Sequence, residues 1–370
     1  MPDFLSAELQ ARRAALTDLC TGTLQRLRDD ASLSDDERAT RVRTASKAAG
    51  VFELTQSSHT PELLLLVVRE TLAQHGVGHL RGLFGAGAGV LAAVAEPLRS
   101  SHLQPLLAGD KQGGFAFTEP ATAARPTWAR LDGDEWVISG QKSYVTGGAD
   151  ADFVTALVDI EGQGPTMVVI DTNATGVTLQ RRFVSLDGSH HAAFTFEAVR
   201  VPLHHAIGAP GDGRGRALAS ISAVRRAIAA DCVGSMAWII ELVAKDLLRE
   251  RRGGARAASE RVRLRYGEMR IQAFAARATV YRVARLADGD KSAGHESVNE
   301  SIAAKVFATE VANHLVDVAV QLVGGEALVE DHPLAQTLRR LRALRLTEGE
   351  TDTLRVNVAR GHLDLGKGRL

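Results

Sequence analysis

The 370-residue chain is poor in the features that would mark a specialised class of protein. It has two cysteines, Cys20 and Cys232, which lack metal-ligand spacing and do not indicate a structural disulfide. That usage favours a reducing, cytoplasmic compartment. Lysine plus arginine (44) balances aspartate plus glutamate (44), so no global charge draws the chain to nucleic acid or to an anionic membrane.

Long apolar runs are also scarce. The longest that we find, residues 63–68 and 90–95, are far shorter than the roughly 20 residues that cross a bilayer. The N-terminus has no basic segment leading into an apolar run, so neither a signal peptide nor membrane insertion is expected. Hydrophobic residues make up 45% and charged residues 24%, which is ordinary for a soluble globular protein of one to three domains.

Residues 1–112 predict an N-terminal helical domain. Apolar residues recur at three- and four-residue intervals from about residue 5 to residue 110. Ser34 and Glu37 have the spacing of a capping box at a helix start. Residues 63–68 and 90–94 are apolar nearly all round, which predicts buried helices.

Residues 113–215 predict a central antiparallel β-domain, a compact barrel or sandwich. Short β-rich runs alternate there with glycine-containing turns. The runs are residues 135–139, 152–158, 166–170 and 193–197, and the turns are 132–134, 162–165 and 187–188. A linker rich in glycine and proline, residues 208–215, closes the region.

Residues 216–370 predict a C-terminal four-helix bundle. Helical patterns cover residues 216–250, 257–287 and 295–323, and a last pair flanks Glu348. The predicted fold class is therefore α+β, mainly α.

The segment Thr347-Glu348-Gly349 places one carboxylate on a glycine hinge between two helical patterns. Removal of a proton α to a thioester carbonyl needs a carboxylate in a dry site, with its pKa raised by burial. The neighbours Leu344, Leu346 and Leu354 are apolar, as such a site requires. A helix-capping acid is the alternative interpretation.

Two patterns together carry a resemblance to a known family. The first is Phe117-Thr118-Glu119-Pro120 followed by residues 136–148, and the second is Gln321 to Gly325 followed by the Glu348 segment. In this order and at this separation they resemble the acyl-CoA dehydrogenase family, over almost the whole chain. The resemblance implies a helical domain, a β-domain and a helical bundle, and FAD-dependent α,β-dehydrogenation of an acyl thioester.

The resemblance assigns the α-proton base to Glu348, with β-hydride transfer to flavin N5. It also implies that the Glu348 backbone N–H donates to the thioester carbonyl, and that Arg225 and Gly349 bind substrate. Some relatives carry the base on the first bundle helix, where this chain has Val224-Arg225. Glu348 is thus the only glutamate at either base position.

The resemblance implies flavin contacts in two parts of the chain. In the β-domain, Tyr144 would pack on the isoalloxazine ring, because stacking tolerates tyrosine where the family usually has tryptophan. The Thr146 hydroxyl would reach the N5 side. The other implied contacts are Phe115, Phe117 and Thr118 in the β-domain, and Arg249, Arg252, Gln321, Gly324 and Gly325 in the bundle. Alternative interpretations are a core strand face for Phe115 and Phe117, a sheet-surface aromatic for Tyr144, and a solvated helical face for the arginines.

The chain departs from the family pattern at four places. Residues 121–126 replace the usual Gly-Ser-Asp, Arg252 replaces a phenylalanine, Arg340 replaces an aspartate and Glu350 replaces a threonine. A guanidinium can still stack on adenine and pair with phosphate. The departures leave open a carrier-protein substrate, a flavin monooxygenase on the same scaffold, a catalytically impaired subunit of a hetero-oligomer, and a non-catalytic paralogue that has lost flavin.

The implied partners are an acyl-CoA or acyl-carrier-protein substrate and an electron-transfer flavoprotein or other acceptor. A dimer or tetramer, possibly with a related subunit, is expected, with a role in fatty-acid or secondary metabolism. No metal is expected, because the adjacent pairs His190-His191 and His204-His205 lack a third ligand at metal-site spacing.

Overall fold

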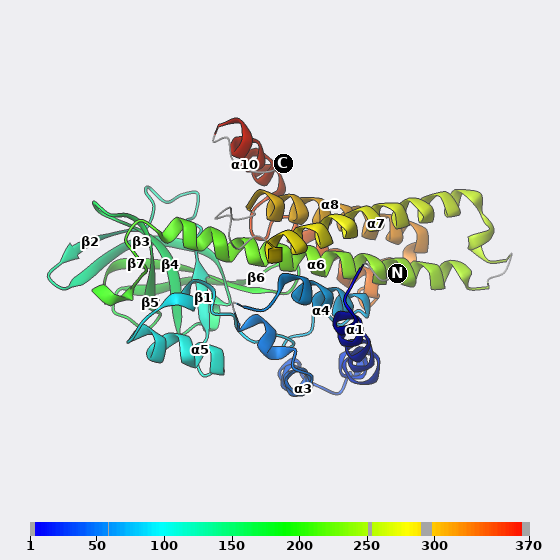
Figure 1. Ribbon diagram of the computed structural model, residues 1–370, viewed down its shortest axis with the longest axis horizontal. Helices are drawn as coiled ribbons and strands as arrows, with labels where there is room; N and C mark the ends of the chain where they lie inside the picture. The colour runs from blue at the N-terminus through cyan, green and yellow to red at the C-terminus, as the bar shows by residue number, and fades with distance from the viewer. Residues whose placement is uncertain (1–3, 58, 251–253, 290–297, 365–370) are drawn as a thin grey trace. The chain divides into compact units, whose positions relative to one another are not determined.

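Helices occupy both ends of the chain and strands occupy its middle, as Figure 1 shows. The computed structural model describes residues 4–57, 59–250, 254–289 and 298–364. The chain divides into two units, which are described separately below. The first comprises Met1–Thr55, His59–Phe84 and Ser222–Leu370, and the second comprises Gln56–Ser58 and Gly85–Ile221. The three-domain division at residues 112 and 215 stays a prediction.

The N-terminal segment is helical, as its periodicity predicts. Its α-helices are α1 (Ala7–Leu19), α2 (Gln25–Asp29), α3 (Asp35–Ala48), α4 (Glu62–Gln74) and α5 (Gln104–Ala108). The capping box at Ser34 is confirmed, because its side chain accepts from the Glu37 backbone N–H while Glu37 accepts from Ser34. The predicted helix at 90–94 is wrong in type, because only a short 3-10 turn, Gly89–Ala93, forms there.

The middle of the chain forms one eight-stranded sheet. The strands are β1 (Gly113–Ala116), β2 (Trp128–Asp132), β3 (Glu135–Thr146), β4 (Phe153–Ile160), β5 (Gly164–Asp171), β6 (Val177–Val184), β7 (His190–Pro202) and β8 (Ala206–Ile207). Their order is β6-β7-β3-β2-β4-β5-β8, with β1 paired to β4. Each β-rich run named above lies within a longer strand, except that the run 152–158 begins one residue before β4.

The pairing is antiparallel except where β4 meets β1 and β2, which run parallel to it. These parallel pairs depart from a purely antiparallel domain. Strand β5 is buried on both faces: Val168 and Ile170 join one apolar cluster, while Met167 and Val169 join another. That double burial explains its continuous apolar run, because a strand with one wet face would alternate.

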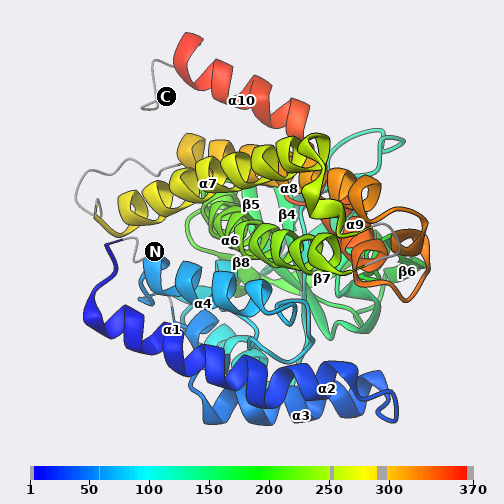
Figure 2. The same cartoon turned by 90° about the vertical axis from the view of Figure 1, so that its right-hand side faces the viewer.

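The C-terminal helices are α6 (Gly213–Leu248), α7 (Glu260–Gly289), α8 (Val298–Val323), α9 (Pro333–Leu344) and α10 (Thr351–Leu363). Figure 2 shows α7 and α8 side by side with α9 near them, and α10 projecting beyond the bundle. One apolar cluster joins buried residues of α6, α7, α8 and α9, so these four helices share a core.

Helices α6 and α8 each contain a window long and apolar enough to cross a membrane, by length and composition alone. Half of each window is buried inside the protein, as in a core helix of a bundle. In α6, acids such as Asp231 and Glu241 interrupt the apolar residues, so no long apolar run marks this helix in the sequence.

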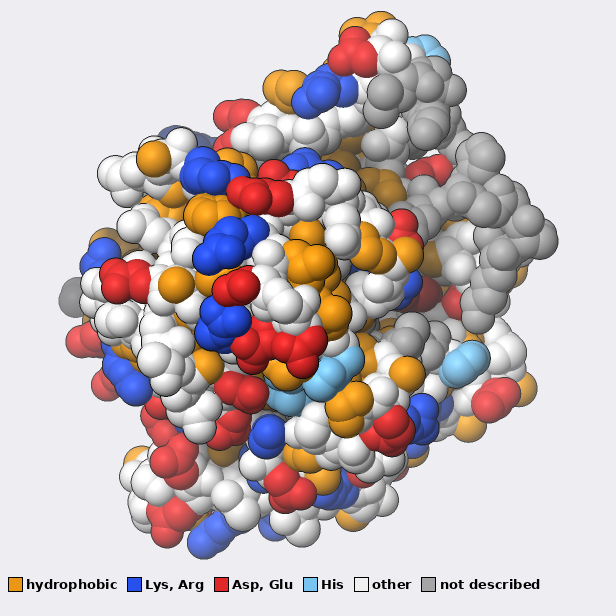
Figure 3. Space-filling view, turned by 90° about the vertical axis from the view of Figure 1, so that its left-hand side faces the viewer, with side chains coloured by type: hydrophobic (Ala, Val, Ile, Leu, Met, Phe, Trp, Pro, Cys, Tyr) orange, Lys and Arg blue, Asp and Glu red, His pale blue; other side chains and the backbone are white. Residues whose placement is uncertain are grey.

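Basic and acidic side chains are interspersed on the face shown in Figure 3, and neither sign dominates it. The mixture matches the zero formal net charge of the chain. This face therefore offers no broad electrostatic attraction to a polyanion.

Candidate active site

Glu348 lies in the turn between α9 and α10, in the first unit. Its φ is +55°, a left-handed conformation that is uncommon for a residue other than glycine. Gly349 follows with φ +112°, and a Cβ there would lie 2.9 Å from Leu354 Cδ2. The backbone of this turn therefore requires glycine directly after the carboxylate.

Burial raises the pKa of the Glu348 carboxyl, and the charges of Arg225 and Lys305 partly oppose that rise. Arg225, on α6, is only 5% exposed, and its Nε donates to the Glu348 carbonyl oxygen at 3.0 Å. The structure thus brings together two residues that the resemblance placed in one site. A carboxylate with a raised pKa in a partly desolvated position suits proton abstraction.

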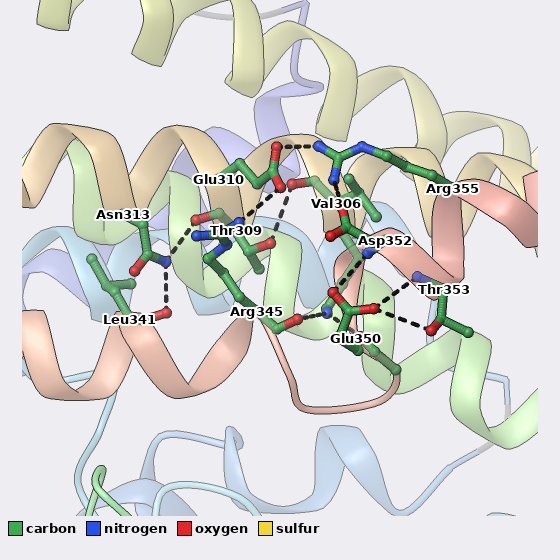
Figure 4. Close-up of polar contacts among 12 residues, drawn as sticks. Val306, Thr309, Glu310, Asn313, Leu341, Arg345, Glu350, Asp352, Thr353 and Arg355 are labelled. Atoms are coloured by element: carbon green, nitrogen blue, oxygen red, sulfur yellow. Dashed lines mark hydrogen bonds and ion pairs between the residues drawn. The ribbon is translucent and has the colours of Figure 1, made fainter.

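Helix α8 holds the Glu348 turn from both ends, as Figure 4 shows. Its Glu310 accepts from Arg345, just after α9, at 3.2 Å and also pairs with Arg355 of α10. Its Asn313 donates from Nδ2 to the Leu341 carbonyl at 2.7 Å. The turn is therefore anchored to one long helix and does not hang free.

Glu350 caps helix α10. Its side chain accepts from the backbone N–H groups of Asp352 and Thr353 at 2.9 and 2.8 Å, as Figure 4 also shows. These bonds lower the pKa of the Glu350 carboxyl. Because a capping residue needs only a side-chain oxygen in reach, glutamate can cap the helix here in place of threonine. The helix-capping acid of this segment is therefore Glu350, and the helix-capping interpretation does not describe Glu348.

Lys305 is a residue near Glu348 that the sequence analysis missed. It lies on α8 with no exposed surface. Its Nζ donates to the Gly349 carbonyl at 2.7 Å and to the Arg345 carbonyl at 3.2 Å. The available signal was a lysine on the apolar face of α8, in helical register with Ala308 and Ala312.

In the second unit, the Thr-Glu-Pro segment pairs with the end of β3. The Ser143 backbone N–H donates to the Thr118 carbonyl at 2.8 Å. Lys142, 1% exposed, donates from Nζ to the Phe117 carbonyl at 3.2 Å and forms an ion pair with Glu119. Sequence reasoning missed this pair, although it fixes the segment that carries Thr118.

Phe115 and Phe117 stack on each other, with centroids 5.9 Å apart and an interplanar angle of 6°. Both pack against an apolar cluster of the second unit. The core-face interpretation therefore holds, while their predicted flavin contact stays a prediction.

Tyr144 is exposed by 67%, with φ +55°. The β3–β7 register shifts between Lys142 and Val145, and such an irregularity re-aims a side chain. The Tyr144 ring meets Phe183 edge-on at 5.3 Å. Thr146 is exposed, with its Oγ1 3.3 Å from His191 Nδ1. The result is an exposed aromatic two residues from an exposed hydroxyl.

The helical flavin candidates lie at two helix ends of the first unit. Gln321 is exposed near the end of α8, and Gly324 follows with φ +89°. Gly325, also exposed, begins a 3-10 turn. Arg249 is exposed just beyond α6, whereas Arg252 lies outside the described residues.

Matches to two protein-family profiles identify the family. A profile for the acyl-CoA dehydrogenase C-terminal domain matches residues 211–363, and one for the middle domain matches residues 108–199. These matches cover more than half of the chain. The chain belongs to the acyl-CoA dehydrogenase family. It is therefore placed among oxidoreductases that act on CH–CH groups.

Relatives and solved structures agree with this assignment. A probable acyl-CoA dehydrogenase of Bacillus subtilis is 27% identical over 277 residues, 72% of each chain. A putative acyl-CoA dehydrogenase from Mycobacterium abscessus has a TM-score of 0.84 at 23% identity, covering 98% of this chain and 99% of that one. An acyl-CoA dehydrogenase from Bacillus anthracis, solved with FAD, has a TM-score of 0.81 at 21% identity, covering 99% of this chain and 69% of that one. These structural likenesses show the fold, and the predicted fold class is confirmed.

Within this dehydrogenase fold, part of the basic stretch after α6 has a structural role. Arg256 pairs with Asp246 and donates to the Leu322 carbonyl. Arg249 is exposed, and it forms no ion pair with another residue that the structure describes. The solvated-face interpretation therefore does not describe Arg256, whereas the exposed Arg249 is compatible with it.

Proposed function

We propose that this acyl-CoA dehydrogenase family member is an FAD-dependent enzyme that forms an α,β-double bond in an acyl thioester. The single observation that carries the proposal is Glu348: a carboxyl group in a left-handed turn, partly buried, with a raised pKa and Arg225 beside it. FAD, when bound, supplies the acceptor for the β-hydride.

Glu348 takes the α-proton onto its carboxylate. Its backbone N–H has no acceptor among the described residues, so it can donate to the thioester carbonyl as negative charge develops on that oxygen. One residue thus supplies the base and an oxyanion contact. Gly349 follows directly, and a Cβ at that position would lie 2.9 Å from Leu354 Cδ2 and 3.4 Å from Arg225 Nη2.

Exposed side chains of the second unit suit the isoalloxazine ring, which is planar and has a polar edge. Tyr144 offers an exposed aromatic face, and Thr146 offers a hydroxyl two residues along. These groups would hold the isoalloxazine ring, together with the backbone at Thr118. In the first unit, Arg249, Gln321, Gly324 and Gly325 are the further FAD-binding candidates that the resemblance implies.

The test replaces Glu348 by Gln and mixes the purified flavoprotein with acyl-CoA thioesters in the absence of oxygen. We expect bound flavin to remain and its bleaching to stop, because the amide cannot accept the α-proton. Glu350→Gln is the matched control, since that acid caps α10 and should leave bleaching intact. Normal bleaching in the Glu348 variant would falsify the proposal.

The substrate carrier and the electron acceptor are tested with the same flavin-bleaching assay. Residues 121–126 differ from the family pattern, so carrier-protein thioesters are compared with CoA thioesters as substrates. An electron-transfer flavoprotein is the proposed acceptor. Flavin that is bleached by neither thioester class, but consumes oxygen once reduced, would instead indicate a monooxygenase.

A further inference from the structure

Lys305 ties together the two ends of the turn that carries Glu348. The Arg345 carbonyl, which it meets at 3.2 Å, stands just past the end of α9. The Gly349 carbonyl, which it meets at 2.7 Å, stands directly after the carboxylate. Arg225 binds the carbonyl of Glu348 itself. Two cations therefore take up three carbonyl groups of one short turn.

Burial of the Lys305 ammonium costs free energy, because the charge loses its hydration. Two carbonyl bonds do not fully replace the water that a charge loses on burial, and an apolar side chain of similar volume often serves stability as well or better. Burial and the charge of Arg225 lower the pKa of Lys305 to about 8. Stability alone therefore does not account for a lysine on this face of α8.

The charged groups around Lys305 come from three elements. Arg225 and Cys232 face it from α6, Glu348 from the turn, and Glu350 from the start of α10. The Cys232 thiol is neutral, because burial raises its pKa, and Glu350 is engaged in capping. Arg225 and Lys305 are left as the two cations that favour the ionised form of Glu348.

We propose that Lys305 is a positioning residue for the general base: its ammonium holds the turn in the left-handed conformation and keeps the Glu348 carboxylate ionised. The inference rests on the proposed role of Glu348. A non-glycine residue keeps a positive φ only where the surroundings hold it there. Lys305 supplies that hold from α8, and its charge acts on the carboxylate in addition.

The first experiment measures flavin reduction by an acyl-CoA thioester in single turnovers from pH 5 to pH 9, for the wild type and Lys305→Met. We expect equal flavin content and a rate about tenfold lower. The acidic limb of the profile, where the rate falls with decreasing pH, should lie about one pH unit higher, because loss of a nearby cation raises a carboxyl pKa by about that much. Lys245→Met is the control, since Lys245 is exposed on α6 and pairs with Glu241. It should change neither quantity.

An unmoved acidic limb in Lys305→Met would overturn the inference, even with a slower rate, because a packing defect alone lowers the rate without moving the limb. A wild type whose flavin is bleached neither by acyl-CoA nor by carrier-protein thioesters would instead overturn the proposed function. The two failures are thus distinguishable.

A measurement on the wild type covers the case in which Lys305→Met does not fold. The Leu346 and Thr347 amides both donate to the Ala343 carbonyl, so their hydrogen exchange reports on the turn. We expect their protection factors to fall about tenfold as Lys305 loses its charge between pH 7 and pH 9.5, because charge-assisted bonds are about twice as strong as neutral ones. Constant protection factors across this range would contradict the claim that the Lys305 ammonium holds the turn.

Discussion

At the scale of the residue, Glu348 is defined by its surroundings more than by its type. Glu350, two positions away, is an equally acidic side chain, yet its pKa is lowered by backbone donors whereas that of Glu348 is raised by burial. Opposite shifts in neighbouring acids assign opposite tasks: one is a permanently charged cap and the other can take a proton.

The raised pKa of Glu348 predicts how the reaction depends on pH. A carboxyl whose pKa is raised stays protonated to a higher pH, and only the ionised form can take the α-proton. The rate of flavin reduction should therefore fall with decreasing pH at a point above the usual glutamate range. The pH profile of single-turnover reduction checks this, and an acidic limb at or below the usual range would contradict it.

Tyr144 offers a second prediction at this scale. Tyr144→Ala should weaken flavin binding by about tenfold or less, because an aromatic pair adds roughly 0.5–1.5 kcal/mol beyond burial. Stability should hardly change, since the ring is 67% exposed. Flavin dissociation is followed by fluorescence, with Tyr144→Phe as the control that keeps the ring. Equal affinity in the alanine variant would show that Tyr144 is only a sheet-surface aromatic.

At the scale of the element, the turn between α9 and α10 works as a unit held by α8. Glu310, Asn313 and Lys305 of α8 reach it at three separate points. Its own backbone is left-handed at Glu348 and Gly349. Because α8 is one continuous helix, the positions of these three side chains relative to one another are fixed, and the turn is held in one geometry.

Gly349→Ala tests that unit. The substitution forces a Cβ to 2.9 Å from Leu354 at φ +112°, which is strained whatever the space. We expect a loss of about 1–3 kcal/mol in the free energy of unfolding, and slower flavin reduction. Urea unfolding measures the first and rapid mixing the second. Gly267→Ala, within α7 and with open space around it, is the control that should not destabilise the fold.

At the scale of the whole molecule, helix α7 presents an exposed apolar stripe. Leu264, Ile271 and Phe274 are 72%, 65% and 76% exposed. Residues 264 and 271 are seven apart, and 274 follows three later, so all lie on one face of the helix. Large apolar side chains gathered in this way mark an interaction surface.

The resemblance implies a dimer or tetramer, and on that ground we predict that a second copy of the chain packs on this stripe. Ile271→Glu with Phe274→Glu should reduce the assembly to a smaller species in sedimentation, with the helical content retained. Arg270→Glu, also exposed on α7, is the control for added negative charge. An unchanged sedimentation coefficient in the double variant would place the interface elsewhere.

Much of this fold could be predicted from the sequence because its signals are local. The capping box at Ser34, the β-rich runs from residue 135 onward and the long helical periods after residue 216 each depend on neighbours in the chain. The prediction of a helix at 90–94 is wrong, because five apolar residues give the same signal in a helix and in a 3-10 turn.

The sequence by itself determined the order of helices and strands, the family, and the choice of Glu348 as candidate base, since these follow from residue types and spacing. Only the tertiary structure decided what surrounds that base. Lys305 is 43 positions upstream of Glu348, and Arg225 is farther still, so neither contact leaves a local pattern. A carboxyl pKa depends on burial and on charges within a few ångströms, and those are set by packing between helices.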